Sequence, residues 1–154
     1  MAPTDFALTA AASFVAMEPI TAATHRWVMH GVGSRLHRSH HRASGDTRWE
    51  DNDVFPLVFA SIVMLGFWCG FHRDSLAWLV PVGVGITMYG AAYAIVHDGY
   101  IHRRVDIFGG RRHRVLDRLA DAHRIHHLHN GAPFGMLIPI GHRASRELVA
   151  DRVG

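Results

Sequence analysis

Residues 75–96 read SLAWLVPVGVGITMYGAAYAIV, and residues 54–71 read VFPLVFASIVMLGFWCGF. Neither stretch contains a charged side chain. Since about 20 apolar residues cross a hydrocarbon core of roughly 30 Å, both predict membrane-spanning helices. A third apolar stretch, residues 6–24, is interrupted only by Glu18 and Pro19. We expect it to be a retained span, because it lacks the positively charged start and the small-residue cleavage site of a signal peptide.

The number of spans decides where the polar segments lie. With three spans, residues 25–53 and the residues from 97 onward emerge on the same side of the membrane. All 16 basic side chains are arginines, and Arg73 alone lies in the loop on the opposite side. Because cytoplasmic loops carry an excess of basic residues, both polar segments are predicted to be cytoplasmic and the protein to lie in the cell's inner membrane.

Length and composition limit the architecture further. The chain has 154 residues and a single cysteine, which excludes a secreted disulfide scaffold. No boundary divides it, so we expect one domain over residues 1–154. The predicted fold class is an all-α integral membrane protein with about three transmembrane helices, a fourth being left open. A cytoplasmic, helical, histidine-rich cap would hold a site for two metal ions.

Smaller apolar features predict packing. Gly66, Gly70 and Gly90 lie within the spans, where small residues let helices approach closely. Residues 134–140 (FGMLIPI) form a run too short to cross a membrane. We expect this run to lie at the membrane interface or against the protein.

Histidine is the second anomaly of the composition, at 14 residues. Ten of them form two copies of one pattern: His25-x4-His30 with His37-x2-His40-His41, and His97-x4-His102 with His123-x2-His126-His127. Positions i, i+3 and i+4 share one face of an α-helix, so each HxxHH segment can present two or three imidazoles to one point. A pair five residues apart does not share a face. HxxxxH therefore requires a helix end, a π-bulge or a site between helices.

Ten neutral imidazoles could hold two metal ions at the membrane surface. Imidazole suits Fe, Zn, Cu and Ni, so the ligands alone do not fix the metal. No HExxH pattern of a zinc protease is present. A redox metal beside the hydrocarbon indicates attack on a C–H bond of a lipid, with dioxygen and external electrons.

At this point the residues resemble a known family, the β-carotene hydroxylases of the fatty-acid-hydroxylase/sterol-desaturase superfamily. The resemblance extends from Glu18 to Gly135 and includes MEPITAATHRWVMHG, LHRSHH followed by WEDNDVF, YAIVHDGYIHRR, and AHRIHHLHNGAPFGM. The histidine boxes are shared across the superfamily. HDGxxHxR and the E-x-N-D segment at Glu50, Asn52 and Asp53 are more specific to carotenoid hydroxylases.

The resemblance implies a non-haem di-iron monooxygenase that uses O2 to hydroxylate carbon 3 of β-ionone rings, from β-carotene through β-cryptoxanthin to zeaxanthin. Electrons would come from a ferredoxin-type donor, and the carotenoid from the bilayer. The iron ligands would be His25, His30, His37, His40, His41, His97, His102, His123, His126 and His127. The short C-terminus, FGMLIPIGH in place of the longer family ending, is a departure that bears on substrate reach.

Other side chains near these boxes are candidates for supporting roles. Glu18 lies in an apolar stretch two helical turns before the first box, so it could accept a hydrogen bond from a ligand imidazole, pair with an arginine, or reach water at the interface. Asp98 and Asp121 adjoin ligand positions and are candidates for the same support. Tyr89 and Tyr93 could line the route of a polyene, or serve ordinary helix packing.

The remaining charged and histidine residues are assigned to the surface. Arg111, Arg112 and Arg114 are expected to contact anionic lipid headgroups or an acidic electron donor. Nucleic-acid binding is not expected, because no recognition fold accompanies the charge. The histidines outside the two patterns are predicted not to bind metal: His72, His113, His129 and His142. His129, two positions after His127, is expected either to support a ligand imidazole or to lie at the surface.

Two other functions stay open from the sequence. One is a superfamily relative that hydroxylates or desaturates a fatty acyl chain or a sterol, which HDGYIHRR disfavours. The other is a membrane protein that binds or transports metal. Such a protein would carry histidines at mid-depth within the spans, whereas here they cluster beyond the span ends.

Overall fold

The computed structural model describes residues 1–41 and 49–139, and within them all regular structure is helical. The helices are α1 (Pro3–Ala23), the π-helix η1 (Thr24–Val32), α2 (Ser34–His41), η2 (Asp51–Asp53), α3 (Val54–His72), η3 (Asp74–Leu76), α4 (Leu79–Ala94), the π-helix η4 (Ile95–Ile101) and α5 (Arg114–His129). The predicted all-α fold class is confirmed.

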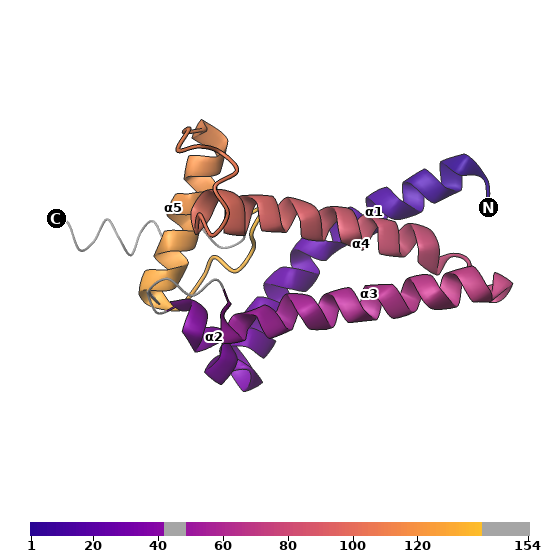
Figure 1. The fold of residues 1–154 in the computed structure, drawn as a ribbon, viewed down its shortest axis with the longest axis horizontal. Helices are drawn as coiled ribbons and strands as arrows, with labels where there is room; N and C mark the ends of the chain where they lie inside the picture. Colours follow the sequence, from indigo (N-terminus) through magenta and orange to yellow (C-terminus); the bar gives the residue numbers. More distant parts are fainter. Residues whose placement is uncertain (42–48, 140–154) are drawn as a thin grey trace.

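Three of these helical stretches are long and apolar enough to cross a membrane: Pro3–Val32, Asp51–His72 and Leu79–Ile101. The third span begins later than expected, because Asp74–Leu76 form a separate 3₁₀ turn. Figure 1 shows the N-terminus and the α3–α4 turn at one end of the molecule, and α2 and α5 at the other. Both histidine-rich segments therefore lie at the same end, as the span count requires.

The three spans do not pack equally on one another. Helix α4 lies along both α1 and α3, whereas α1 and α3 make few contacts. The tightest approach is at Gly85 of α4, where a Cβ atom would overlap the carbonyl oxygen of Ala10 and lie 2.8 Å from Cβ of Ser13. Gly83 is covered by the ring of Phe67 in the same way. Glycine thus permits the close helix crossings that small residues favour in membranes.

Of the three glycines predicted to allow close helix packing, the structure confirms one. At Gly70 an added Cβ would lie 2.8 Å from Cγ2 of Val80, so this position does require glycine. At Gly66 and Gly90 no neighbouring atom lies within 4 Å of an added Cβ, and the prediction is wrong there. An added Cβ would meet open space at both positions. The hydrophobic runs have no clear period, so the sequence did not reveal which glycines lie at a helix contact.

The chain after α5 returns to the spans. Asn130 ends α5 with a positive φ of 52°, and the backbone N–H groups of Leu137 and Ile138 donate to the carboxylate of Glu18 in α1. The short apolar run therefore lies against the protein over residues 134–139. Its last residue, Ile140, is outside the described residues, as are His142 and the rest of the C-terminus.

We expect Gly85→Ala to lower the melting temperature of the purified protein in detergent, because overpacking at a tight contact costs about 1–3 kcal/mol. Gly66→Ala is the matched control, since its Cβ meets open space and alanine is a better helix former by about 1 kcal/mol. Equal melting temperatures for the two variants would contradict the α1–α4 crossing described here.

Candidate metal centre

Each HxxxxH pair lies on a π-helix where a span ends. His25 and His30 belong to η1, and His97 lies in η4 with His102 directly after it. The N–H of His102 donates to the carbonyl of His97 over 2.8 Å, a hydrogen bond of i to i+5 type. Residues five apart stand nearly above one another in this geometry, so both imidazoles of a pair point the same way. Of the three alternatives for HxxxxH, the structure has the π-helix.

The HxxHH segments lie on short cap helices, α2 and α5, which bring three histidines each to the span ends. His37 and His40 are buried on α2, and His123 and His126 are buried on α5. All ten histidines singled out in the sequence come together in this cap.

The ten imidazoles form two groups. Site A contains five imidazoles whose ring nitrogens lie within 4.8 Å of one another: His25, His30, His37, His41 and His126. Site B contains His40, His97, His102 and His123 by the same measure, and His127 joins it through a 2.8 Å contact between its Nε2 and that of His123. The rings of His41 and His127 stack at 4.3 Å and connect the two sites.

Each cap helix contributes two histidines to one site and one histidine to the other. Site A takes the i, i+4 pair of α2, His37 and His41, together with His126 from α5. Site B takes the i, i+4 pair of α5, His123 and His127, together with His40 from α2. The sequence suggested that each HxxHH segment would serve a single point. The structure instead divides each segment between both sites, which links them into one unit.

In five of the rings Nδ1 lies within hydrogen-bond distance of an acceptor. These contacts assign the tautomer in which Nδ1 carries the proton. Nδ1–H of His25 donates to the carbonyl of Phe134 (3.1 Å), and that of His126 to the carbonyl of Gly131 (2.6 Å). In three other rings the acceptor is a side chain: His37 to Asn52 (2.7 Å), His40 to Glu50 (2.9 Å) and His97 to Asp98 (2.8 Å). A neutral imidazole protonated at Nδ1 keeps a free lone pair on Nε2.

These lone pairs face each other within each site. Nε2 of His25 lies 3.1 Å from Nε2 of His37 in site A, and Nε2 of His40 lies 3.0 Å from Nε2 of His97 in site B. With both Nδ1 atoms protonated, neither pair has a proton to share, so the arrangement is repulsive without a cation. Two imidazole nitrogens bound at right angles to a metal at ~2.1 Å would lie about 3.0 Å apart. The residues present therefore fit metal ions.

Burial keeps the cap imidazoles neutral, as ligation requires. Loss of solvation lowers the pKa of His37 to about 4, that of His126 to about 3 and that of His127 to about 2. Burial lowers the pKa of His40 and of His123 as well, and neighbouring imidazoles add to the effect. All of these rings are thus unprotonated at neutral pH.

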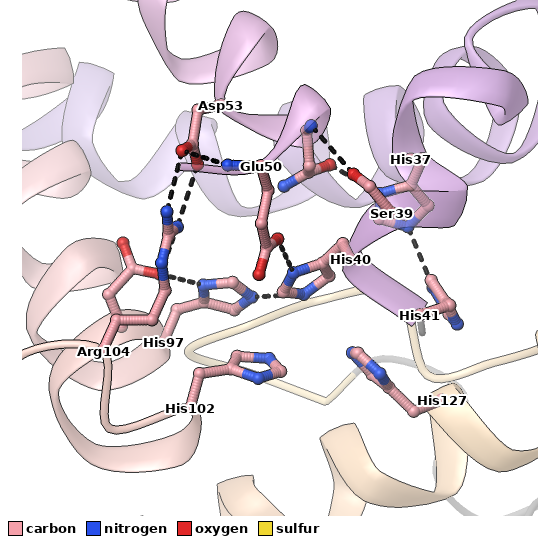
Figure 2. A network of polar contacts seen from close by, with 12 residues as sticks. His37, Ser39, His40, His41, Glu50, Asp53, His97, His102, Arg104 and His127 are labelled. Carbon is pink, nitrogen blue, oxygen red and sulfur yellow. Dashed lines mark hydrogen bonds and ion pairs between the residues drawn. The ribbon is translucent and has the colours of Figure 1, made fainter. Parts of the chain in front are cut away.

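A polar network supports site B from the side of α3 (Figure 2). Arg104 forms a two-fold ion pair with Asp53, with N–O distances of 2.9 and 2.7 Å, and lies 3.5 Å from Asp98. Asp53 also accepts the backbone N–H of Glu50 over 3.0 Å. The carboxylate of Glu50 points at Nδ1 of His40, as Figure 2 shows, and Asp98 accepts from Nδ1 of His97.

Reading the sequence residue by residue did not single out Glu50, Asn52 or Arg104 as part of the site. Each is a hydrogen-bonding or charged residue in a polar segment, and such residues are common at surfaces. The available signal was the family-specific pattern, since Glu50 and Asn52 belong to E-x-N-D and Arg104 ends HDGxxHxR.

An apolar cavity of about 510 Å³ leads to the histidines from the membrane side. It lies between α1, α3 and α4, in the space left because α1 and α3 barely touch. One face of α3 lines it with Phe55, Phe59, Val63 and Phe67, and its polar end includes His25 of site A and His97 of site B. An apolar molecule in this cavity would thus reach both groups of imidazoles.

Of the two aspartates proposed from the sequence to support ligand imidazoles, one does so in the structure. Asp98 bonds to His97, whereas Asp121 is exposed on α5 and bonds to no histidine within the described residues. Two positions before His123 correspond to about 200° around a helix, so Asp121 faces away. Tyr89 and Tyr93 both line the cavity, and Tyr89 is only 1% exposed.

Glu18 makes none of the three contacts expected for it. The side chain is 5% exposed, so it does not reach water, and its described partners are neither imidazoles nor arginines. The hydroxyl of Tyr89 donates to it over 2.6 Å, and two backbone N–H groups of residues 137 and 138 donate as well. The carboxylate lies too deep in α1 to meet the cap.

Three of the four other histidines lie in the described residues, apart from both sites. His72 is exposed at the far end of α3 and bonds to the carbonyl of Trp68. His113 and His129 are exposed at the two ends of α5.

We expect Glu50→Ala to weaken metal binding about 10–100-fold, because an acceptor on the far nitrogen fixes the orientation and basicity of a ligating imidazole. Purified protein in detergent would be titrated with Fe²⁺ or Zn²⁺ against a competing chelator. Asp51→Ala is the matched control, since Asp51 is the exposed neighbour of Glu50. Unchanged affinity in Glu50→Ala would contradict the proposed support of His40.

The chain is similar in sequence to beta-carotene hydroxylases of both bacteria and plants. The chain is 40% identical over 126 residues to the beta-carotene hydroxylase of Pseudescherichia vulneris, covering 77% of this chain and 66% of that one. It is 37% identical to the beta-carotene hydroxylase of a Paracoccus species, covering 78% and 73%. It is 38% identical to the chloroplastic beta-carotene 3-hydroxylase of an Oncidium hybrid, covering 90% and 46%.

The chain thus spans less than two thirds of the length of the Pseudescherichia and Oncidium proteins. No solved structure matches it. Residues 10–145 match the family described as fatty acid hydroxylase, a range that contains both sites and the cavity. The chain belongs to the fatty acid hydroxylase family.

Proposed function

We propose that the protein is a membrane oxidoreductase that hydroxylates carbon 3 of β-ionone rings, converting β-carotene through β-cryptoxanthin to zeaxanthin. One observation carries the proposal: an apolar cavity among the spans ends between one imidazole of each site, His25 and His97. The names of the bacterial and plant relatives supply the substrate class.

The ten imidazoles would hold two iron ions, one in each site. Iron supplies the activation of dioxygen that insertion of oxygen into a C–H bond requires. The overall reaction consumes the C–H bond, O2, two electrons and two protons, and yields the alcohol and water. Imidazole also suits zinc, copper and nickel. Hydroxylation by O2 needs a redox metal, which disfavours zinc, and iron is proposed over copper because the resemblance to the β-carotene hydroxylases implies it.

The chain's own residues would bind and orient the ring. Phe55, Phe59 and Tyr93 give the cavity apolar and aromatic walls, which exclude water and suit a hydrocarbon. The acceptors Glu50 and Asp98 hold His40 and His97 with their Nε2 atoms toward the site. The positions of His25 and His97 at the cavity end would bring a ring carbon, and not the middle of the polyene, close to the metals.

The alternatives account for less of the molecule. A metal transporter needs ligands along a path through the membrane, whereas the described histidines of both sites gather at one end of the spans. A relative acting on fatty acyl chains or sterols would share the histidines. It would not explain the resemblance of HDGYIHRR to the HDGxxHxR pattern of carotenoid hydroxylases, in which the last arginine, Arg104, forms ion pairs with Asp98 and Asp53.

The proposal extends to partners and location. A ferredoxin-type protein would supply the electrons, and the carotenoid would enter from the lipid of the inner membrane. Arg111, Arg112 and Arg114 are exposed at the start of α5 or just before it, where they would meet an acidic donor or lipid headgroups. The histidine sites would face the cytoplasm.

The substrate proposal predicts that a bacterium accumulating β-carotene forms β-cryptoxanthin and zeaxanthin when it expresses this chain. Pigment chromatography with mass detection is the measurement. His40→Ala should form no product because it removes an imidazole of site B, whereas His72→Ala should keep near-full activity because His72 lies at the opposite end of α3. Unchanged β-carotene together with newly hydroxylated acyl chains would favour the superfamily alternative.

The orientation proposal predicts that a reporter requiring an oxidising compartment is active when inserted at Arg73. The same reporter fused after Gly154 should be inactive, because the histidine end carries almost all the arginines and stays in the cytoplasm. Alkaline phosphatase activity in whole cells measures both. The reverse pattern would place the metal sites outside the cytoplasm.

A further inference from the structure

Glu18 is the one acidic side chain buried within the apolar length of α1, and its role is not explained by the metal sites. A carboxylate in a membrane span is costly, so it is retained where it binds donors. Its Oε2 accepts the hydroxyl of Tyr89 (2.6 Å) and the N–H of Leu137 (3.2 Å), and its Oε1 accepts the N–H of Ile138 (2.9 Å).

Two of the three donors belong to a segment without regular structure, residues 134–138. Irregular backbone at membrane depth needs partners for its N–H groups, since lipid supplies none. The carboxylate supplies them here. The segment passes so close that a Cβ on Gly135 would lie 2.6 Å from Oε1 of Glu18 and overlap the carbonyl of Ile138.

The segment in turn reaches site A through Phe134. The carbonyl of Phe134 accepts the Nδ1–H of His25, and its ring lies 5.6 Å from those of His25 and His30 and 5.4 Å from that of His126. The same ring lines the polar end of the cavity. Phe134 therefore contributes both to the orientation of one imidazole and to the wall that a bound ring would touch.

We propose that Glu18 is a positioning residue, which binds the backbone at Leu137 and Ile138 and thereby fixes Phe134 against His25 and the cavity. In site B the Nδ1 acceptors of His40 and His97 are Glu50 and Asp98, and neither is held by Glu18 among the described contacts. The inference about the cavity wall rests on the proposed function, whereas the anchoring of the segment does not.

The test compares Glu18→Leu with Tyr89→Phe in full-length purified protein. Glu18→Leu removes all three acceptor contacts and places an apolar, helix-forming side chain in α1. Tyr89→Phe removes the contacts of the hydroxyl with Glu18 and Thr21, both between α4 and α1, and leaves the bonds of Glu18 to Leu137 and Ile138. Hydrogen exchange at the amides of Leu137 and Ile138 should rise roughly tenfold or more in Glu18→Leu, because each lost bond to a charged acceptor exposes a backbone donor. It should stay at the wild-type rate in Tyr89→Phe.

Gly135→Ala provides an independent variant that leaves α1 untouched. Its Cβ would push the segment off the carboxylate, so exchange at Leu137 and Ile138 should rise as in Glu18→Leu. Hydrogen exchange at Leu137 and Ile138 that stays at the wild-type rate in Glu18→Leu would overturn the proposal. If Glu18→Leu does not accumulate, the same result in Gly135→Ala would overturn it. Equal exchange in Glu18→Leu and Tyr89→Phe would also overturn it, since Glu18 would then only join two helices.

Steady-state kinetics on β-carotene separate positioning from a loss of folded protein. A displaced Phe134 should raise KM several-fold in Glu18→Leu and Gly135→Ala, whereas partial unfolding lowers kcat in proportion to the inactive fraction and leaves KM unchanged. An unchanged KM would remove the role in the cavity wall. If the wild type does not turn over β-carotene, the proposed function fails, and the exchange measurement still decides the anchoring.

Discussion

The structure depends on the convergence of unprotonated imidazole nitrogens at one end of three membrane helices. Lone pairs 3.0–3.1 Å apart repel unless a cation lies between them, so the geometry of this cap is compatible with a metal site. Acceptors on the other ring nitrogens determine which atoms converge. Because each cap helix gives histidines to both sites, the metal ions would also join α2 to α5 and each to the span ends.

Two departures from regular helix make this convergence compatible with a membrane. The π-helices η1 and η4 turn both histidines of an HxxxxH pair to the same side at the end of a span. The hydrogen bond from His102 to His97 shows the wider turn directly. In η1 the change of helix type ends at a kink, since Gly31 has non-helical φ and ψ of −96° and −114°.

The cavity follows from unequal packing of the spans. Gly85 lets α4 approach α1 closely, and α4 also contacts α3, but α1 and α3 leave a space that side chains line without filling. The polar end of that space is closed by residues that also hold the histidines, including Asp98 and Phe134. The geometry of the metal sites and the shape of the cavity are therefore coupled.

The sequence alone determined the span number, the shared side of both polar segments and the set of ten histidines that meet. These follow from the length of uncharged runs, the parity of crossings and a duplicated spacing, all of which are local in the chain. A departure from the regular helix at HxxxxH was also readable, but the sequence left a helix end, a π-bulge and a site between helices as alternatives, and the structure decided for the π-helix. The prediction that Gly70 serves helix packing rested on its small size within a span and is confirmed. The same prediction for Gly66 and Gly90 was wrong.

Only the tertiary structure decided which histidines share a site, since the exchange of His40 and His126 depends on how α2 and α5 face each other. It also decided the three donors to Glu18, which lie 71, 119 and 120 residues away in the chain, and the pairing of Arg104 with Asp53, 51 residues away. Asp121 shows that closeness in sequence does not predict a contact: it lies two positions before His123 but on another face of α5. Hydrogen bonds between distant segments depend on packing, and no local pattern encodes that.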